Sequence, residues 1–145
     1  MTTIEAIKNS WGWTGLDPLE VIAMNEFGNL LIRDKSACIW RLCPEDLYCK
    51  IVAPSETEYR DLLENAEFID DWEMKTLVQA VREMLGVLEE GRRYCLKLPG
   101  PVGGTYSSDN LTTLRLIELI EFSGYLANQI KDIPDGTQIR LDVAS

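Results

Sequence analysis

This chain of 145 residues contains no histidine, and its four cysteines include no C-x-x-C pair. Histidine is the usual base that activates a serine or cysteine nucleophile, so its absence argues against the common forms of nucleophilic catalysis. A serine–lysine arrangement would be the remaining alternative, and no pattern in the sequence indicates one. Zinc sites need paired ligands, so we expect no metal site. We expect the cysteines to be reduced and to act as small apolar side chains: Cys38, Cys43, Cys49 and Cys95.

The chain also lacks an apolar run of about 18 residues, so no transmembrane helix is predicted. Its first residues, MTTIEAIKNSWGW, place Glu5 and Lys8 where a secretory signal would need an unbroken apolar core. We therefore expect a cytoplasmic protein. The length is typical of one domain, residues 1–145, and a hydrophobic content of 46% is ordinary for a globular protein.

Positive charge is scarce, because 14 lysines and arginines stand against 24 aspartates and glutamates, a net charge of −10. This balance argues against nucleic acids and anionic membranes as ligands, and it is compatible with a basic protein partner. Most of the excess falls within residues 56–73, where Arg60 is the single cation. The acidic residues of this segment are Glu56, Glu58, Asp61, Glu64, Glu67, Asp70, Asp71 and Glu73.

Two interpretations of this acidic segment stay open. Carboxylates near the start of a helix interact favourably with its dipole and keep an outer face solvated, which is a purely structural role. Alternatively, the acidic face occupies the basic cleft in which a nuclease binds phosphates, and it also speeds association by electrostatic steering. Paired carboxylates for acid–base catalysis would be a third use, but no spacing singles out two of them. We predict no catalytic residues.

The apolar patterns predict an α+β fold in a single domain. A short N-terminal helix ends by Gly12 and is followed by an antiparallel meander of strands with tight turns. Two central amphipathic helices come next, the first with a capping box formed by Ser55 and Glu58, the second ending at Gly91. A strand, a helix and a strand complete the chain. The predicted strands are residues 20–25, 30–33, 37–42, 48–52, 111–116 and 137–143, and the later helices are residues 55–66, 72–90 and 117–129.

Residues 98–110, LPGPVGGTYSSDN, cannot form a helix or a central strand, because proline removes backbone donors and glycine readily adopts positive φ. A long loop inside a compact fold serves either as a tight corner or as a binding surface. A phosphate-binding loop would need a Lys-Ser/Thr pair, which is absent. If the loop lies at an interface, we expect these residues there: Gly100, Pro101, Gly103, Gly104 and Tyr106.

Two stretches of the chain resemble a known family. The loop, with its flanking residues 95–97 and 110–124, resembles the C-terminal domain of type VI secretion system immunity proteins, long described as a domain of unknown function. That family shows a similar P…LGG…N(L/I) signature before an apolar strand and a helix. This chain has Val102 where the family has leucine, and Pro101 is an addition. Residues 25–47, NEFGNLLIRDKSACIWRLCPEDL, are similar to the family's N-FGN…W-R-hydrophobic-x-PE hairpin.

The resemblance implies a non-enzymatic bacterial protein that binds and neutralises a cognate toxin in the producing cell, with nucleases as frequent counterparts. We therefore predict occlusion of a basic active-site cleft by the acidic segment, with apolar or aromatic side chains anchoring the centre. No cofactor is expected. The alternative is an intracellular regulatory or adaptor domain of the same fold that has no toxin partner. The oligomeric state is not predicted.

Overall fold

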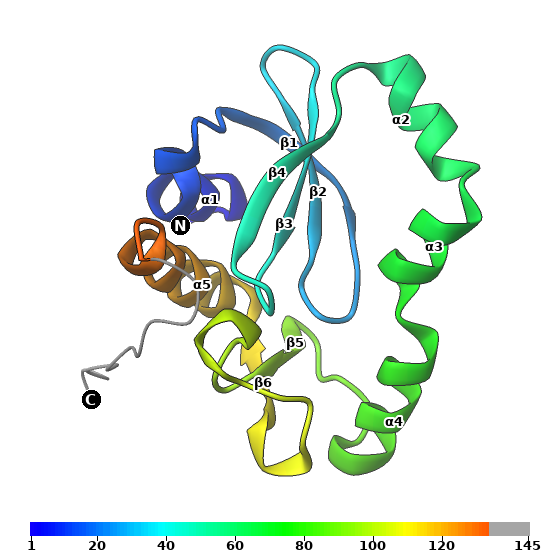
Figure 1. Ribbon diagram of the computed structural model, residues 1–145, viewed down its shortest axis with the longest axis vertical. Coiled ribbons are helices and arrows are strands. Elements are labelled where there is room, and N and C mark those ends of the chain that lie inside the picture. The colour runs from blue at the N-terminus through cyan, green and yellow to red at the C-terminus, as the bar shows by residue number, and fades with distance from the viewer. Residues whose placement is uncertain (134–145) are drawn as a thin grey trace.

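A computed structural model describes residues 1–133, and these form an α+β fold (Figure 1). An antiparallel meander, then helices, then a strand followed by a helix confirm the predicted fold class. The predicted last strand, residues 137–143, lies outside the described residues. The helices are α1 (Thr3–Trp11), α2 (Glu56–Leu63), α3 (Ala66–Glu73), α4 (Lys75–Leu85) and α5 (Leu116–Ile130), with the 3₁₀ turns η1 (Gly12–Thr14), η2 (Gly100–Val102) and η3 (Ser108–Asn110). The strands are β1 (Pro18–Met24), β2 (Leu30–Asp34), β3 (Ile39–Cys43), β4 (Tyr48–Ala53), β5 (Arg92–Leu96) and β6 (Leu111–Arg115).

The larger sheet has the strand order β1-β2-β3-β4, so each strand pairs with the next one along the chain. In its central pair, Leu30 lies opposite Leu42. Strand β3 begins two residues later than predicted, because Ala37 adopts a left-handed φ of 68° in the preceding turn. The Cys38 N–H then donates to the Asp34 carboxylate at 2.9 Å and closes that turn. Cys38 therefore precedes the strand and is half-buried, unlike the other three cysteines, which are buried.

Helices α1 and α5 pack together and cover one face of the larger sheet, as Figure 1 shows. The core on this side contains fully buried side chains from α1, β2 and α5, including Trp11, Leu30, Ile32 and Ile120. The indole N–H of Trp11 donates to the carbonyl of Ile120 at 3.2 Å. A buried indole needs such a partner, so this bond fixes α1 against α5.

The opposite face of the sheet carries a thinner layer formed by α2 and α3. Successive residues of a strand point to opposite faces, so Leu31 lies on this side while its neighbours face α1 and α5. Leu31, Ile39 and Ala53 are buried here against the partly buried aromatic rings of Tyr59, Phe68 and Trp72. Neither α2 nor α3 contains a fully buried residue. These two helices are therefore attached to the sheet by a few aromatic side chains.

The structure divides the two predicted central helices into three. Asn65 caps α3 by accepting a hydrogen bond from the Phe68 N–H, so the first predicted helix stops short of residue 66. Met74 adopts a left-handed conformation with φ 50° and separates α3 from α4. Gly86, with φ 85°, ends α4 five residues before the predicted Gly91. A continuous apolar stripe does not show whether the helix that carries it is interrupted.

Candidate partner-binding surface

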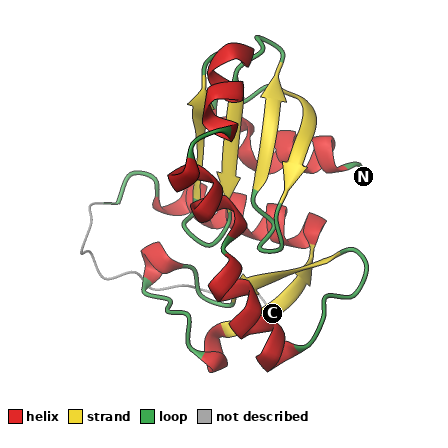
Figure 2. Ribbon diagram, turned by 90° about the vertical axis from the view of Figure 1, so that its right-hand side faces the viewer, coloured by secondary structure: helices red, strands yellow, loops and turns green. Residues whose placement is uncertain are grey.

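The predicted acidic residues lie along α2 and α3, which cross in front of the sheet in Figure 2. We refer to residues 56–73 as the acidic arm. Glu56 is half-buried, and the other seven acidic side chains of the arm are exposed. Ser55 caps the start of the arm by accepting a hydrogen bond from the Glu58 N–H at 3.3 Å. Most carboxylates of the arm are therefore presented to solvent, whereas Glu56 and Asp71 reach arginines of the sheet.

Three carboxylates of the arm are ion-paired with cations of the chain. Glu56 accepts from Arg33 at 3.1 Å, Glu73 lies 3.0 Å from the ammonium of Lys75, and Asp71 pairs with Arg41. The remaining five form no ion pair with any residue among 1–133: Glu58, Asp61, Glu64, Glu67 and Asp70. The arm thus carries uncompensated negative charge.

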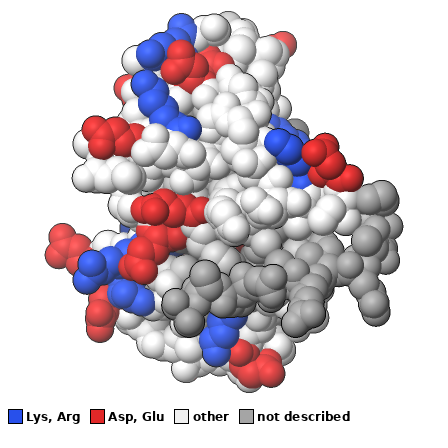
Figure 3. Space-filling view, turned by 90° about the vertical axis from the view of Figure 1, so that its left-hand side faces the viewer, with Lys and Arg blue, Asp and Glu red and all other residues white. Residues whose placement is uncertain are grey.

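The opposite side of the molecule, formed by α1 and α5, has a different charge pattern. Figure 3 shows lysines, arginines and acidic residues interspersed there, with wide uncharged areas between them. Such mixed surfaces produce little net field at a distance, whereas charges of one sign add together. Of these two surfaces, the acidic arm therefore carries the more uniformly negative charge.

A buried arginine fastens the arm to the sheet. Arg41, on β3, is 4% exposed; its Nε donates to Asn29 Oδ1 at 3.0 Å and its Nη1 to Asp71. The guanidinium also lies 5.3 Å from the centre of the Trp72 ring. Burial alone would lower the pKa of Arg41, but the hydrogen bond to Asp71 and nearby negative charges raise it. A permanent positive charge therefore holds the end of α3 against the sheet.

The turn between β1 and β2 holds the same end of α3 through the side chain of Asn25. Its Nδ2 donates to the carbonyl of Trp72 at 2.9 Å, across 47 positions of sequence. Its Oδ1 accepts from the backbone N–H groups of Phe27 and Asn29 at 3.1 and 2.9 Å. In this turn Gly28 has φ 69°, and a Cβ there would lie 2.6 Å from Leu119. These contacts explain the residue types of the N-FGN stretch.

Asn29 connects these hydrogen bonds to the turn between β3 and β4. Its Nδ2 donates to Glu45 Oε1 at 2.7 Å, and the thiol of Cys43 donates to the same oxygen at 3.0 Å. The other carboxylate oxygen, Oε2, is buried and has no hydrogen-bond partner among the described residues. Burial raises the pKa of Glu45, although the bonds from Cys43 and Asn29 act in the opposite direction. The carbonyl of Glu45 accepts from the Gly100 N–H at 2.9 Å, which ties the loop to this turn.

The glycine–proline loop, residues 98–110, is held by its backbone conformation and by the side chain of Asn110. Gly103 has φ 99°, and a Cβ on Gly104 would lie 1.5 Å from the carbonyl oxygen of Leu98. The Asn110 side chain accepts from the Leu98 N–H at 2.9 Å and donates to the carbonyls of Leu98 and Thr105 at 3.0 and 2.7 Å. This geometry favours a tight corner at Gly103 and Gly104.

Other predicted loop residues face solvent. Pro101 and Tyr106 are exposed, and Gly100 is half-buried against the turn that contains Glu45. The two interpretations of the loop therefore apply to different residues. Its glycine pair forms the corner, and its exposed side chains are available for contact with another molecule.

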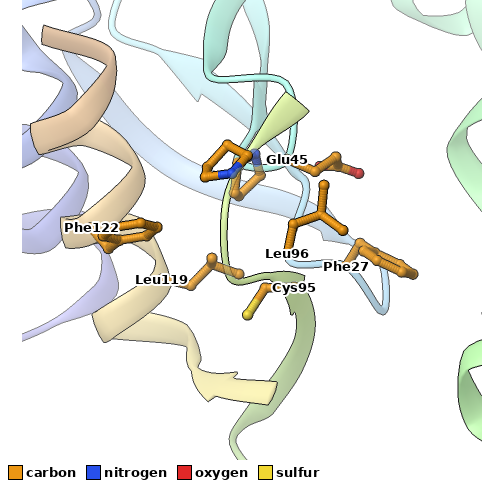
Figure 4. A pocket seen from close by; sticks show the side chains of 8 residues that line it. Phe27, Glu45, Cys95, Leu96, Leu119 and Phe122 are labelled. Carbon is orange, nitrogen blue, oxygen red and sulfur yellow. The ribbon is translucent and has the colours of Figure 1, made fainter. Parts of the chain in front are cut away.

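A shallow apolar recess lies beside the loop (Figure 4). The side chains of Leu96, Leu119 and Phe122 line it, and it has no room for a water molecule. Burial raises the pKa of the Cys95 thiol, which also lines it, to about 11, and that of Cys49 to about 12. Thiols with such pKa values are poor nucleophiles at neutral pH.

Among residues 1–133, no three cysteine or acidic side chains are grouped so that they could hold a metal ion. Within the same range, no helix combines the length and apolar character needed to cross a membrane. Cys43, Cys49 and Cys95 are buried free thiols, as the sequence predicts for small apolar side chains.

Sequence reasoning missed the polar network that links these parts: Asn25, Asn29, Arg41, Glu45 and Asn110. Four of these residues stand in the N-FGN and W-R-x-x-PE stretches, and Asn110 ends the P…N(L/I) signature. An arginine inside an otherwise apolar strand is a usable signal, because a buried charge requires a partner. The signal does not identify that partner, since Asp71 lies 30 positions away.

The acidic arm is thus an exposed surface, fixed to a packed scaffold, on which five carboxylates form no ion pair within residues 1–133. The family model described as T6SS immunity protein Tdi1, C-terminal, matches residues 53–127. This match covers half of the chain, and the chain belongs to that family of type VI secretion immunity proteins. The matched region includes the acidic arm and the glycine–proline loop. No curated protein matches the chain.

Proposed function

We propose that this chain neutralises a cognate secreted effector by binding it in the cytoplasm of the producing cell, with the acidic arm covering a basic active-site cleft such as that of a nuclease. Membership of the immunity family supports the effector partner. The observation that carries the mode of binding is the row of five carboxylates along and between α2 and α3 that form no ion pair with any residue among 1–133.

Electrostatics explains why such a row favours a basic partner. The five carboxylates repel one another in the free protein, and this repulsion is relieved when cations of a partner lie between them. Their common field also draws an oppositely charged cleft toward the arm before contact, which raises the association rate. The same side chains therefore contribute both to the rate of association and to the choice of partner.

The proposal assigns no chemistry to this chain, because its action is to exclude substrate from the active site of the effector. Aromatic side chains near the arm and the loop supply the apolar part of such a contact, since interfaces combine an apolar centre with a charged rim. Tyr106 is 45% exposed and meets this description.

The test is to co-express the chain with the product of its adjacent gene, and to measure rescue from growth arrest and co-purification of the two proteins. A complex together with rescue supports the proposal. A complex without rescue, or no complex, contradicts it and favours a regulatory or adaptor domain without a toxin partner.

Salt dependence tests the mode of binding separately. Exposed charges are screened beyond about 8 Å at physiological ionic strength, so raising the salt concentration should slow association much more than it changes dissociation. The control is a variant in which Glu118 and Glu121 of α5, on the opposite face, are replaced by glutamine. It removes two negative charges but leaves the arm intact, so its association rate should depend on salt as that of the unchanged chain does. An association rate that does not depend on salt contradicts occlusion by the acidic arm.

A further inference from the structure

We call three side chains the rim: Asp46, Asp71 and Tyr106, where the negative charges of Asp46 and Asp71 are close enough to act on the hydroxyl of Tyr106. Asp71 belongs to α3 and Tyr106 to the loop, while Asp46 belongs to the turn between β3 and β4. The carboxylate of Asp46 lies against the loop, because a Cβ added to Gly100 would be 3.4 Å from Asp46 Oδ1. The rim therefore unites three segments that are far apart in the sequence.

A buried carboxylate with an unused acceptor lies beside Asp46 of the rim. Glu45 is 3% exposed, and its Oε2 has no donor among the described residues. The thiol of Cys43 lies 3.0 Å from Glu45 Oε1 and 3.7 Å from Asp46 Oδ2, so the two carboxylates are close neighbours. Figure 4 shows the carboxylate of Glu45 pointing away from Leu119 and Phe122. A buried acceptor without a donor is destabilising, so a donor within reach of Oε2 would be favourable.

The aromatic side of the rim is the ring of Tyr106, which lies 6.4 Å from the ring of Phe27 in an edge-on arrangement. Phe27 in turn lines the same recess as Glu45. Carboxylates beside an aromatic ring form the environment that a guanidinium group prefers, through bidentate hydrogen bonds and cation–π attraction. The chain already contains one such arrangement, in which Arg41 lies between the carboxylate of Asp71 and the ring of Trp72.

We propose that the rim receives an arginine side chain of the partner, which stacks on Tyr106 and donates to Asp46. This inference rests on the proposed function for the existence of a partner, and it names the contact at the centre of the interface. The uncompensated charge of the arm attracts the partner from a distance, and the rim provides the short-range contact. The network from Gly100 through Glu45, Asn29 and Arg41 to Asp71 keeps the two sides of the rim in fixed relation.

The hydroxyl of Tyr106 provides a spectroscopic signal for this contact. Burial and then the negative charges of Glu45 and Asp46 raise the pKa of Tyr106. A cation placed in the rim offsets those charges, so it should lower the pKa of Tyr106. The direction of this change distinguishes a guanidinium in the rim from any neutral group that lies there.

The first experiment needs no effector. The chain is titrated with N-acetyl-arginine amide to about 10 mM, and its amide and tyrosine NMR signals are followed, with the uncharged N-acetyl-citrulline amide as control. Shifts centred on Asp46 and Tyr106 with the arginine compound alone support the proposal. Shifts that are spread over the acidic arm, equal for both compounds or absent overturn it.

The second experiment uses the product of the adjacent gene as the binding partner. Tyr106→Ala should weaken the complex about tenfold or more, Tyr106→Phe should bind almost as the unchanged chain does, and Asp46→Asn should weaken it several-fold. Tyr125→Ala is the matched control, because Tyr125 is 66% exposed on α5. Thermal unfolding of each variant confirms that it is folded.

The two proposals fail in different ways. If the unchanged chain binds and protects, but Tyr106→Ala binds equally well, the rim assignment is wrong and the immunity function stands. If the unchanged chain does not bind the gene product, the proposed function fails, and the titration with the arginine compound still decides whether the rim accepts a guanidinium.

Discussion

The acidic arm and the glycine–proline loop are both surface segments of the matched family region, yet they are fixed in opposite ways. No residue of α2 or α3 is fully buried, and side chains such as Trp72 and Asp71 attach these helices to the sheet. The loop is fixed by backbone geometry at Gly103 and Gly104 and by the three hydrogen bonds of Asn110. The acidic arm therefore contributes surface charge, whereas the glycine–proline loop contributes a fixed backbone conformation.

This separation has a direct physical consequence. The exposed carboxylates of the arm contribute little to the free energy of folding, because each is solvated before and after the chain folds. Two glycines of the loop are needed for different reasons: a side chain at Gly104 would have to displace the backbone of Leu98, and one at Gly103 would be strained by its φ of 99°. Substitutions in the loop should therefore mainly lower the free energy of unfolding, whereas substitutions in the arm should mainly weaken binding of the partner.

The largest effect on stability is expected from Gly104→Ala. The added Cβ would lie 1.5 Å from the carbonyl oxygen of Leu98, so the backbone must move, and we expect a loss of about 4 kcal/mol. Gly103→Ala, which meets no atom within 4 Å but has φ 99°, should cost about 1 kcal/mol. Gly12→Ala, at φ −61° and with open space, is the neutral control. Urea unfolding measures all three, and equal losses at Gly103 and Gly104 would contradict the close backbone approach.

The next effect is expected from Arg41→Met, which keeps most of the side-chain volume and removes the charge. Asn29 Oδ1 would lose its buried donor, and α3 would lose its ion pair, so we expect a loss of about 2 kcal/mol. Limited proteolysis should show earlier cleavage within residues 56–73 than in the unchanged chain. Arg60→Met, which removes an exposed arginine of the arm, is the control, and matching cleavage in the two variants would contradict the role given to Arg41.

A smaller effect is expected from pH, through the carboxyl of Glu45. Burial raises its folded-state pKa above the ordinary value of 4.5. Such a group stabilises the fold fully below the unfolded-state pKa, and that contribution is lost as the pH rises through the folded-state pKa. The unchanged chain should therefore lose stability relative to Glu45→Gln as the pH rises from about 4 toward 7. Urea unfolding across this range measures the difference, and a constant or opposite trend would contradict it.

The smallest effect on stability is expected from neutralising the arm with Asp61→Asn, Glu64→Gln, Glu67→Gln and Asp70→Asn together. These exposed carboxylates make no ion pair within residues 1–133, so the unfolding free energy should change by less than about 1 kcal/mol. The association rate with the cognate effector should nevertheless fall about tenfold at low salt. An unchanged association rate would contradict the binding role proposed for the acidic arm.

The sequence was sufficient to predict the meander and the capped start of α2, because these depend on local patterns. The apolar run at residues 30–33 and the alternation within residues 37–42 predict strands that the structure contains as β2 and β3, and Ser55 caps α2 as expected. The break at Met74 could not be predicted, since methionine has no preference for the left-handed conformation that it adopts there.

The candidate surface was predicted less completely than the fold. The acidic residues of the arm are visible as a run of charge, so their exposure on helices follows from composition and periodicity. Their attachment depends on pairs that are distant in the sequence, such as Arg41 with Asp71 and Asn25 with Trp72. Gly100 and Glu45 form a third such pair. Long-range pairs of this kind depend on tertiary packing, which a single sequence does not display.

The interruptions at Asn65 and Met74 have a geometric consequence for the acidic arm and the helix that follows it. At 1.5 Å per residue, α2 and α3 are each about 12 Å long and α4 is about 17 Å long. One continuous helix would form a straight rod that touches a concave surface only near its ends. Three short segments joined at angles instead run one after another down one side of the molecule, past the larger sheet and then beside β5 and β6, as Figure 1 shows. The breaks at Asn65 and Met74 therefore set the outline of the surface that α2, α3 and α4 present to solvent.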